Sequence, residues 1–144
     1  MAIDQGTHAS RALVLDRRGR IVSSGEQAIG MTHPQPDWSE QDGDEVVASV
    51  LAVARRGSVC VAGLSSQRAS AVCWDRRDGR PLWPIFSWQD RRAHAWIDQL
   101  APYGASVHAK TGLFLSSHYG ASKLRWALDH LPAVREAMRA RTLA

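Results

Sequence analysis

The spacing of apolar residues changes along this chain, and that change limits the folds it can adopt. Up to Trp88 the apolar residues form short runs rich in Val, Ile and Leu, separated by turn residues, as is typical of strands. After Trp88 they recur at helical spacing, as in Leu124, Ala127, Leu128 and Leu131. One helical pattern, at residues 44–56, interrupts the strand region. This order predicts an α/β fold in which helices flank a mixed sheet.

The boundaries of the expected elements follow from turn and helix-end residues. Residues 11–16 and 21–29 predict a hairpin that turns at Gly19, and residues 30–43 predict a loop rich in Pro, Gly and Asp. Further strands are expected at residues 58–67 and 69–75, and an extended segment with two prolines at 81–88. Helices are expected at 44–56, before Gly57, and at 89–101, 120–131 and 132–141, the last opened by Pro132.

Length and composition indicate a globular protein and favour a cytoplasmic location. The chain has 144 residues, of which 44% are hydrophobic and 22% charged, and it fits one ordinary domain. No apolar run approaches the ~20 residues of a membrane span, and the start lacks the pattern of a signal peptide. Cys60 and Cys73 lie in apolar runs without CxxC spacing, which predicts two buried thiols in a reducing compartment.

The net charge of +4 is concentrated in the second part of the chain. Residues 91–144 carry 8 Lys and Arg against 3 Asp and Glu. These basic residues are scattered over helical segments, without a dense run or interleaved aromatic residues. We therefore expect solvated helix faces and no nucleic-acid partner.

The short stretch between the first two apolar runs holds a carboxylate, a glycine and a hydroxyl. These are Asp4, Gly6 and Thr7, and Arg11 follows just behind them. Asp and Gly favour turns for purely local reasons, so a simple hairpin turn is one interpretation. The other is an anion-binding loop, because glycine lets the backbone approach a ligand and successive N–H groups can cradle a phosphate. Arg11 would then add positive charge, and Asp4 could hold Mg²⁺ directly or through water.

Two later stretches contain candidate ligand-binding side chains. Gln67 and Arg68 end an apolar run, where open α/β sheets place ligand groups, and both carry several donors suited to hydroxyl oxygens. The alternative is that Arg68 caps the sheet edge or pairs with a carboxylate. Trp88 precedes Gln, Asp and two Arg residues, a composition suited to the wall of a sugar site. The alternative is that Trp88 belongs to the core and that Asp90 caps the following helix.

Taken in order, several stretches of the chain resemble the N-terminal part of FGGY-family carbohydrate kinases, and the glycerol kinase branch in particular. They are AIDQGT, PQPDWSEQD, SSQR, WDRRDGRPL, FSWQDRR, KTGL and ASKLRWALDH. The resemblance implies an actin-like, ribonuclease-H-like ATPase fold, of which residues 1–144 form an incomplete N-terminal domain. It also implies transfer of the γ-phosphate of MgATP to a hydroxyl of a small sugar or polyol. The rest of this domain and the C-terminal domain would be missing.

The resemblance assigns roles to individual residues. Asp4 would face Mg²⁺, possible phosphate or ATP contacts are Gly6, Thr7, His8 and Arg11, and the substrate-binding residues would be Gln67, Arg68, Trp88 and His118. The catalytic base is expected in the absent domain, so we expect little or no kinase activity from this chain alone. Whether the protein forms a homo-oligomer is left open.

The chain also departs from the family pattern. His8 and Ala9 stand where the family loop has Thr and Ser, Ala69 stands where glycerol kinases have an acidic residue, and His118 replaces a tyrosine. Glycerol, another polyol and a ketose therefore all stay open as substrates. Two further interpretations are a non-catalytic sugar-binding remnant of the fold and, more weakly supported, a phosphatase or regulator of the same actin-like superfamily.

Overall fold

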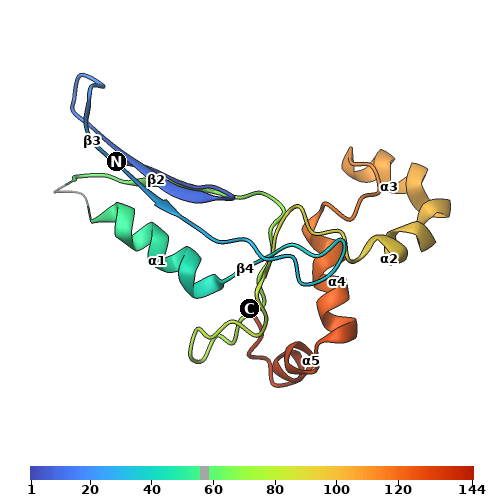
Figure 1. Cartoon of the computed structure of the whole chain (residues 1–144). Coiled ribbons are helices and arrows are strands. Elements are labelled where there is room, and N and C mark those ends of the chain that lie inside the picture. Colours follow the sequence, from blue (N-terminus) through green and yellow to red (C-terminus); the bar gives the residue numbers. More distant parts are fainter. Residues whose placement is uncertain (56–58) are drawn as a thin grey trace. The chain divides into compact units, whose positions relative to one another are not determined.

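The computed structural model describes residues 1–55 and 59–144 of the chain (Figure 1). These residues divide into two compact units, and the chain passes between them more than once. The first unit comprises Met1–Thr32 and Gln41–Arg68, and the second comprises His33–Glu40 and Ala69–Ala144. The predicted helix end at Arg56, the stop at Gly57 and the strand start at Ser58 lie outside the described residues.

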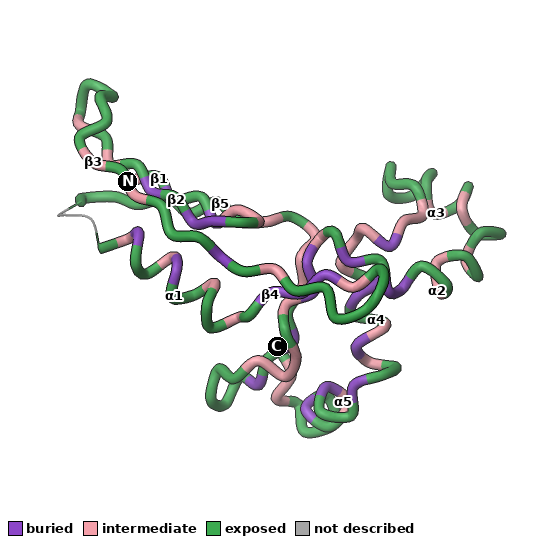
Figure 2. The backbone as a smooth tube through the Cα atoms, in the orientation of Figure 1, coloured by how far each residue is buried: buried purple, intermediate pink, exposed green. Residues whose placement is uncertain are grey.

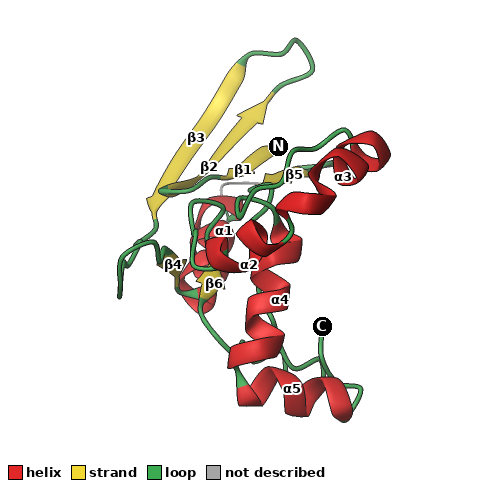
Figure 3. Cartoon of the chain, turned by 90° about the vertical axis from the view of Figure 1, so that its right-hand side faces the viewer, coloured by secondary structure: helices red, strands yellow, loops and turns green. Residues whose placement is uncertain are grey.

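The first unit is a mixed four-stranded sheet covered by one helix (Figure 3). Its strands are β1 (Ala2–Gln5), β2 (Ala9–Leu15), β3 (Ile21–Ala28) and β5 (Gly63–Ser66), in the order β3-β2-β1-β5. β2 pairs antiparallel with β1 and β3, whereas β5 runs parallel to β1. The helix α1 (Gly43–Ala54) comes before the parallel strand β5 in the sequence. The predicted hairpin and mixed sheet are therefore confirmed.

Side chains alternate between the two faces of the sheet along each strand, and the apolar set decides which face α1 covers. Ile3 and Ala12 are buried and pack with Val53 of α1. Ser10 points to the same side, where its hydroxyl lies 2.8 Å from that of Ser49, again in α1. Figure 2 shows buried segments among exposed ones along the strands of this sheet and along α1. The opposite face of the sheet carries the more exposed residues.

The second unit is mainly helical. It contains β6 (Ile85–Phe86), which pairs with β4 (Glu40–Gln41), and a short 3₁₀ turn at Ala101–Tyr103. Its helices are α2 (His94–Gln99), α3 (Gly104–Thr111), α4 (Gly120–His130) and α5 (Pro132–Arg139). The buried core consists of Cys73, Phe86, Ala127, Leu131 and Val134. Among the described residues, no helix combines the length and apolar character that crossing a membrane requires.

Two strand predictions differ from the structure. The expected strand at 58–67 is ordered as a strand only over Gly63–Ser66, and Cys60 before it is exposed, so the prediction of a buried thiol is wrong for Cys60 and confirmed for Cys73. The segment 69–75 forms isolated bridges in place of a strand. Ala69 has a φ of 69°, which interrupts the extended backbone at the start of that segment.

The helical predictions hold for α1, α4 and α5, and the helix predicted at 89–101 is present in part, as α2. The helix expected at 89–101 begins only at His94, because Asp90 forms a turn by accepting hydrogen bonds from the backbone and side chain of Arg92. α3 was not expected; it ends before Gly112, whose φ of 71° suits a helix C-terminus. α5 stops at Arg139 because Arg141 lies in the left-handed region, with a φ of 58°.

Candidate functional site

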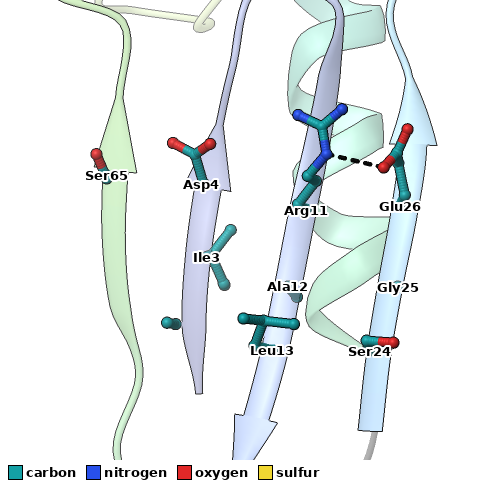
Figure 4. Close-up of a pocket in the computed structure, with 10 residues that line it drawn as sticks. Ile3, Asp4, Arg11, Ala12, Leu13, Ser24, Gly25, Glu26 and Ser65 are labelled. Carbon is teal, nitrogen blue, oxygen red and sulfur yellow. Dashed lines mark hydrogen bonds and ion pairs between the residues drawn. The ribbon is translucent and has the colours of Figure 1, made fainter. Parts of the chain in front are cut away.

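The register of the sheet places Asp4 and Arg11 side by side. They are directly paired across β1 and β2, and the row continues to Ser65 on β5 and to Glu26 on β3. Figure 4 shows these side chains on the face of the sheet opposite α1. They line a hollow of about 530 Å³ whose floor also includes Leu13 and Ser24. The predicted neighbourhood of carboxylate and guanidinium is thus present.

Gly6 keeps open the space between these two charged groups. A Cβ at this position would lie 3.8 Å from Arg11 Nη1 and 3.8 Å from Asp4 Oδ2. It would also press on the carbonyl oxygen of Ala9 at 3.0 Å, the same oxygen that accepts a hydrogen bond from Gly6 N. A side chain at residue 6 would therefore enter the gap and strain the turn.

Glu26 holds Arg11 from one side. Its Nε donates to Glu26 Oε2 at 2.8 Å, and both side chains are more than half exposed, at 53% and 58%. Figure 4 shows the Nε edge of the guanidinium facing Glu26. A surface ion pair of this kind is worth little in stability, but it limits the rotamers of the arginine.

The loop that joins β1 to β2, together with Asp4 and Arg11 on either side of it, has the chemistry to bind a magnesium-bound phosphate. Arg11 offers positive charge with donors in a fixed fork, and Asp4 offers the hard oxygen ligand that Mg²⁺ prefers. Within residues 1–55 and 59–144, no three His, Cys, Asp or Glu side chains gather into a site that could hold a metal.

Gln67 touches this loop from the end of β5. Its amide nitrogen donates to the carbonyl oxygen of Gly6 at 3.2 Å and to Gln41 Oε1 at 3.0 Å. The exposed Arg68 follows it as the last residue of the first unit. Substrate binding by Gln67 and Arg68 stays a prediction, and the structure adds that Gln67 contacts the loop. Sequence reasoning missed Gln41, which lies in a segment predicted as loop.

The second unit brings Trp88 and His118 together. Their ring centroids lie 5.6 Å apart in an edge-to-face arrangement, and His118 makes a similar contact with Tyr119 at 5.2 Å. The backbone N–H of Trp88 donates to Ser70 Oγ at 2.9 Å. Trp88 is only partly buried and lies outside the buried core cluster, so the alternative that it is a core residue is wrong.

A buried lysine fixes the backbone beneath His118. Lys123 Nζ donates to the carbonyl oxygens of Ser117 at 3.0 Å and His118 at 2.7 Å. Burial lowers the pKa of Lys123 to about 8, while the nearby Asp90 carboxylate partly opposes that shift and Arg92 adds to it. Sequence reasoning missed this lysine, although a lysine inside the helical pattern of residues 120–131 was a visible signal.

The segment that carries Trp88 is anchored by a buried ion-pair cluster. Arg92 contacts Asp90 at 2.6 Å and Glu40 at 2.7 Å, with all three side chains almost fully buried. Its guanidinium carbon lies 3.8 Å from the ring centre of Trp38. Asp90 also accepts a hydrogen bond from the backbone N–H of Ser39 at 2.8 Å. The alternative that Asp90 caps the following helix is wrong, because α2 begins at His94 with Ala93 at its N-cap and no side-chain cap.

Comparison with known proteins supports the resemblance seen in the sequence. The family model described as the N-terminal domain of the FGGY family of carbohydrate kinases matches residues 1–144. Glycerol kinases of Acidovorax ebreus (strain TPSY) and Burkholderia cenocepacia (strain HI2424) are each 39% identical over 155 residues, which cover 100% of this chain. The chain spans only 31% of the length of these relatives.

Solved structures show the same fold. Glycerol kinase of Plasmodium falciparum with ADP matches 99% of this chain and 31% of its own, with a TM-score of 0.93 at 22% identity. A xylulose kinase from Brucella ovis matches 92% of this chain and 29% of its own, with a TM-score of 0.82 at 24% identity. These likenesses confirm the actin-like kinase fold, of which the chain covers a part.

Proposed function

Because the chain belongs to the FGGY family of carbohydrate kinases, as its N-terminal domain, we propose that it supplies the phosphate-binding loop and one wall of the sugar site of an ATP-dependent kinase. The whole enzyme would transfer the γ-phosphate of MgATP to a hydroxyl of a sugar or polyol, in the manner of a glycerol kinase. The observation that carries this proposal is the gap at Gly6, which is bordered by the Asp4 carboxylate and the Arg11 guanidinium.

The proposed loop has the parts that phosphoryl transfer requires. Such reactions need little covalent help from the protein and depend on positioning and charge neutralisation. Arg11 would neutralise charge on the terminal phosphates, and the backbone and hydroxyl of Thr7 would donate to their oxygens. Asp4 would hold Mg²⁺, which would supply positive charge to offset the charge that develops on the phosphate.

The proposed sugar site uses different chemistry. The indole of Trp88 would offer an apolar face to the C–H groups of a sugar, while Arg68 would offer donors to its hydroxyl oxygens. Gln67, whose amide nitrogen contacts the Gly6 carbonyl, would border the substrate next to Arg68. His118, which contacts Trp88, would add a ring nitrogen beside the indole. Contacts to hydroxyl groups discriminate strongly between substrates, so these residues would select among glycerol, other polyols and ketoses.

The substrate hydroxyl needs a base, which we expect from a C-terminal domain outside this chain. General-base help is typically worth ~10²–10⁴-fold in rate. This chain alone should therefore bind ligands with little or no turnover. In a cell the C-terminal domain would be its partner, and the site of action would be the cytoplasm.

Titration calorimetry with MgADP and MgATP tests the phosphate side. We expect the Arg11→Met variant to bind MgADP at least about tenfold more weakly, because it loses a charge-assisted contact. Asp4→Asn should lower the dependence of binding on Mg²⁺. Arg20→Met is the matched control, since Arg20 is another exposed arginine of the β2–β3 hairpin and pairs with Asp16.

The competing proposal is a sugar-binding remnant without turnover. His8 and Ala9, which replace loop hydroxyls, are the residues that favour it. Under that proposal the chain binds polyols, and neither nucleotide changes the affinity. Equal MgADP affinity of the parent chain and Arg11→Met would also count against the kinase proposal.

A further inference from the structure

Three glutamine side chains meet beneath the loop that joins β1 to β2. Gln67 Nε2 donates to Gln41 Oε1 at 3.0 Å and lies 3.3 Å from Gln5 Oε1. Gln41 is 1% exposed and Gln5 is 8% exposed, so this amide cluster is largely shielded from water. The three residues come from the end of β1, the end of β4 and the segment after β5.

The cluster is attached to two successive carbonyl groups of the loop. Gln5 Nε2 donates to the carbonyl oxygen of Gly6 at 2.8 Å, and Gln67 Nε2 contacts the same oxygen at 3.2 Å. Gln41 Nε2 donates to the carbonyl oxygen of Thr7 at 2.8 Å. The Gly6–Thr7 and Thr7–His8 peptide planes are therefore held by side chains, two of which, Gln41 and Gln67, come from distant parts of the sequence.

Fixing a carbonyl also fixes the N–H group of the same peptide plane. In a trans peptide the C=O and N–H bonds point in opposite directions. The plane that contains the Gly6 carbonyl also contains the N–H of Thr7, and the plane with the Thr7 carbonyl contains the N–H of His8. When the carbonyls point into the glutamine cluster, these two N–H groups point away from it. Successive N–H groups held in this way are the usual donors of an anion-binding loop.

We propose that Gln5, Gln41 and Gln67 are positioning residues, whose amide network aims the Thr7 and His8 N–H groups at a nucleotide phosphate. The inference rests on the proposed function and deepens it, because it accounts for how a loop that lacks two hydroxyl donors keeps its donors in place. It also gives Gln67, at the end of β5, a role on the phosphate side of the site.

Amide side chains suit this task better than the alternatives. An amide donates and accepts at once, as Gln41 does when it donates to Thr7 and accepts from Gln67. An ionised carboxylate cannot donate to a carbonyl, and a buried charge costs more than a buried amide. A methionine would keep the volume and remove both functions, which makes it the sharper substitution for a test.

The experiment compares Gln41→Met with Gln27→Met in the full chain. Gln27 is an exposed glutamine on β3, so its substitution controls for the loss of an amide. Two measurements are made on each variant: the backbone amide ¹⁵N shifts of Thr7 and His8, and the affinity for MgADP. We expect Gln41→Met to move the His8 signal, whose peptide plane holds the Thr7 carbonyl, and to weaken MgADP binding about tenfold. Gln27→Met should change neither.

Gln67→Met provides a second test if Gln41→Met does not fold. Gln67 is only partly buried, and its loss removes a contact to the Gly6 carbonyl, so the Thr7 signal should move. Unchanged Thr7 and His8 signals in a folded variant overturn the inference, as does MgADP affinity within twofold of the parent chain.

The two measurements also separate this inference from the proposed function. Absence of MgADP binding by the parent chain contradicts the nucleotide role of both. Binding that depends on Arg11 but not on Gln41 or Gln67 leaves the proposed function standing and overturns the glutamine network alone.

Discussion

At the scale of single residues, burial decides what an ion pair contributes. Arg92 and Arg125 each contact an aspartate, but the Arg92 pair is fully buried, whereas the side chains of Arg125 and Asp129 are 54% and 36% exposed. One nitrogen of Arg92, Nη1, has no hydrogen-bond partner within the described ranges. The stacking of its guanidinium on Trp38 partly compensates for that.

Arg92→Met should therefore be far more damaging than Arg125→Met. Removing Arg92 leaves the carboxylates of Asp90 and Glu40 buried without their cation, which should lower the free energy of unfolding by about 3–5 kcal/mol. The exposed pair of Arg125 should be worth less than about 1 kcal/mol. Urea unfolding measures both values, and similar losses in the two variants would contradict this explanation.

Ala69 carries backbone strain next to a predicted substrate residue. Its φ of 69° lies in the left-handed region, which costs a residue with a Cβ about 1–2 kcal/mol. Ala69→Gly should raise the free energy of unfolding by up to about 1 kcal/mol, because the greater freedom of unfolded glycine offsets part of the relief. Ala71→Gly, two residues on and outside the left-handed region, should lower it. Equal changes measured by urea unfolding would argue against strain at Ala69.

At the scale of elements, helical spacing and turn residues predicted most of what the structure contains. The β2–β3 hairpin, α1, α4 and α5 follow from local patterns. The pairing of Asp4 with Arg11 belongs to the neighbouring antiparallel pair of β1 and β2. The segment 69–75 looks like a strand because its composition suits one, but the backbone at Ala69 turns it aside. No local sequence pattern indicates the left-handed backbone at Ala69.

The parts of the candidate site that escaped prediction depend on contacts between distant segments. Gln41 binds the Thr7 carbonyl across 34 positions of the sequence, and Arg92 binds Glu40 across 52. Polar residues in loops are usually exposed, so composition gives no sign that these would be buried. Their roles become visible only once the loops are placed on the strands.

The start of α1 is set by a side-chain cap. Asp42 accepts hydrogen bonds from the backbone N–H groups of Asp44 and Glu45 at 2.8 and 2.9 Å. Asp42→Ala should lower the free energy of unfolding by about 1 kcal/mol, whereas Asp42→Asn should keep most of the cap. Thermal or urea unfolding of the two variants measures this. Loss of stability in Asp42→Asn equal to that in Asp42→Ala would show that charge, and not the cap, is responsible.

At the scale of the whole molecule, two buried groups act oppositely on the stability of the chain at alkaline pH. Burial raises the pKa of the Cys73 thiol and lowers the pKa of Lys123 to about 8, since in each case it disfavours the charged form. Above the ordinary thiol value of 9.0 the unfolded chain loses the Cys73 proton first, which lowers stability as pH rises. The lowered pKa of Lys123 has the opposite effect and raises stability as pH rises.

The contribution of Lys123 should increase between pH 8 and pH 10.5. In this window the folded chain has released the Lys123 proton, while the unfolded chain, with a value of 10.5, still binds it. Because the unfolded state then holds more protons, the free energy of unfolding rises with pH. Lys123→Met removes this rise, so the parent chain should gain stability relative to the variant as pH increases across the window.

Urea unfolding of the parent chain and Lys123→Met at several pH values measures this difference directly. The Cys73 effect is common to both proteins and cancels in the comparison. Lys110→Met, at an exposed position of α3, corrects for the general loss of one lysine charge. A parent-to-variant difference that stays constant from pH 8 to pH 10.5 would mean that folding does not shift the titration of Lys123. The lysine would then hold the Ser117 and His118 carbonyls as a permanent cation, and the wall formed by His118 would not respond to pH through it.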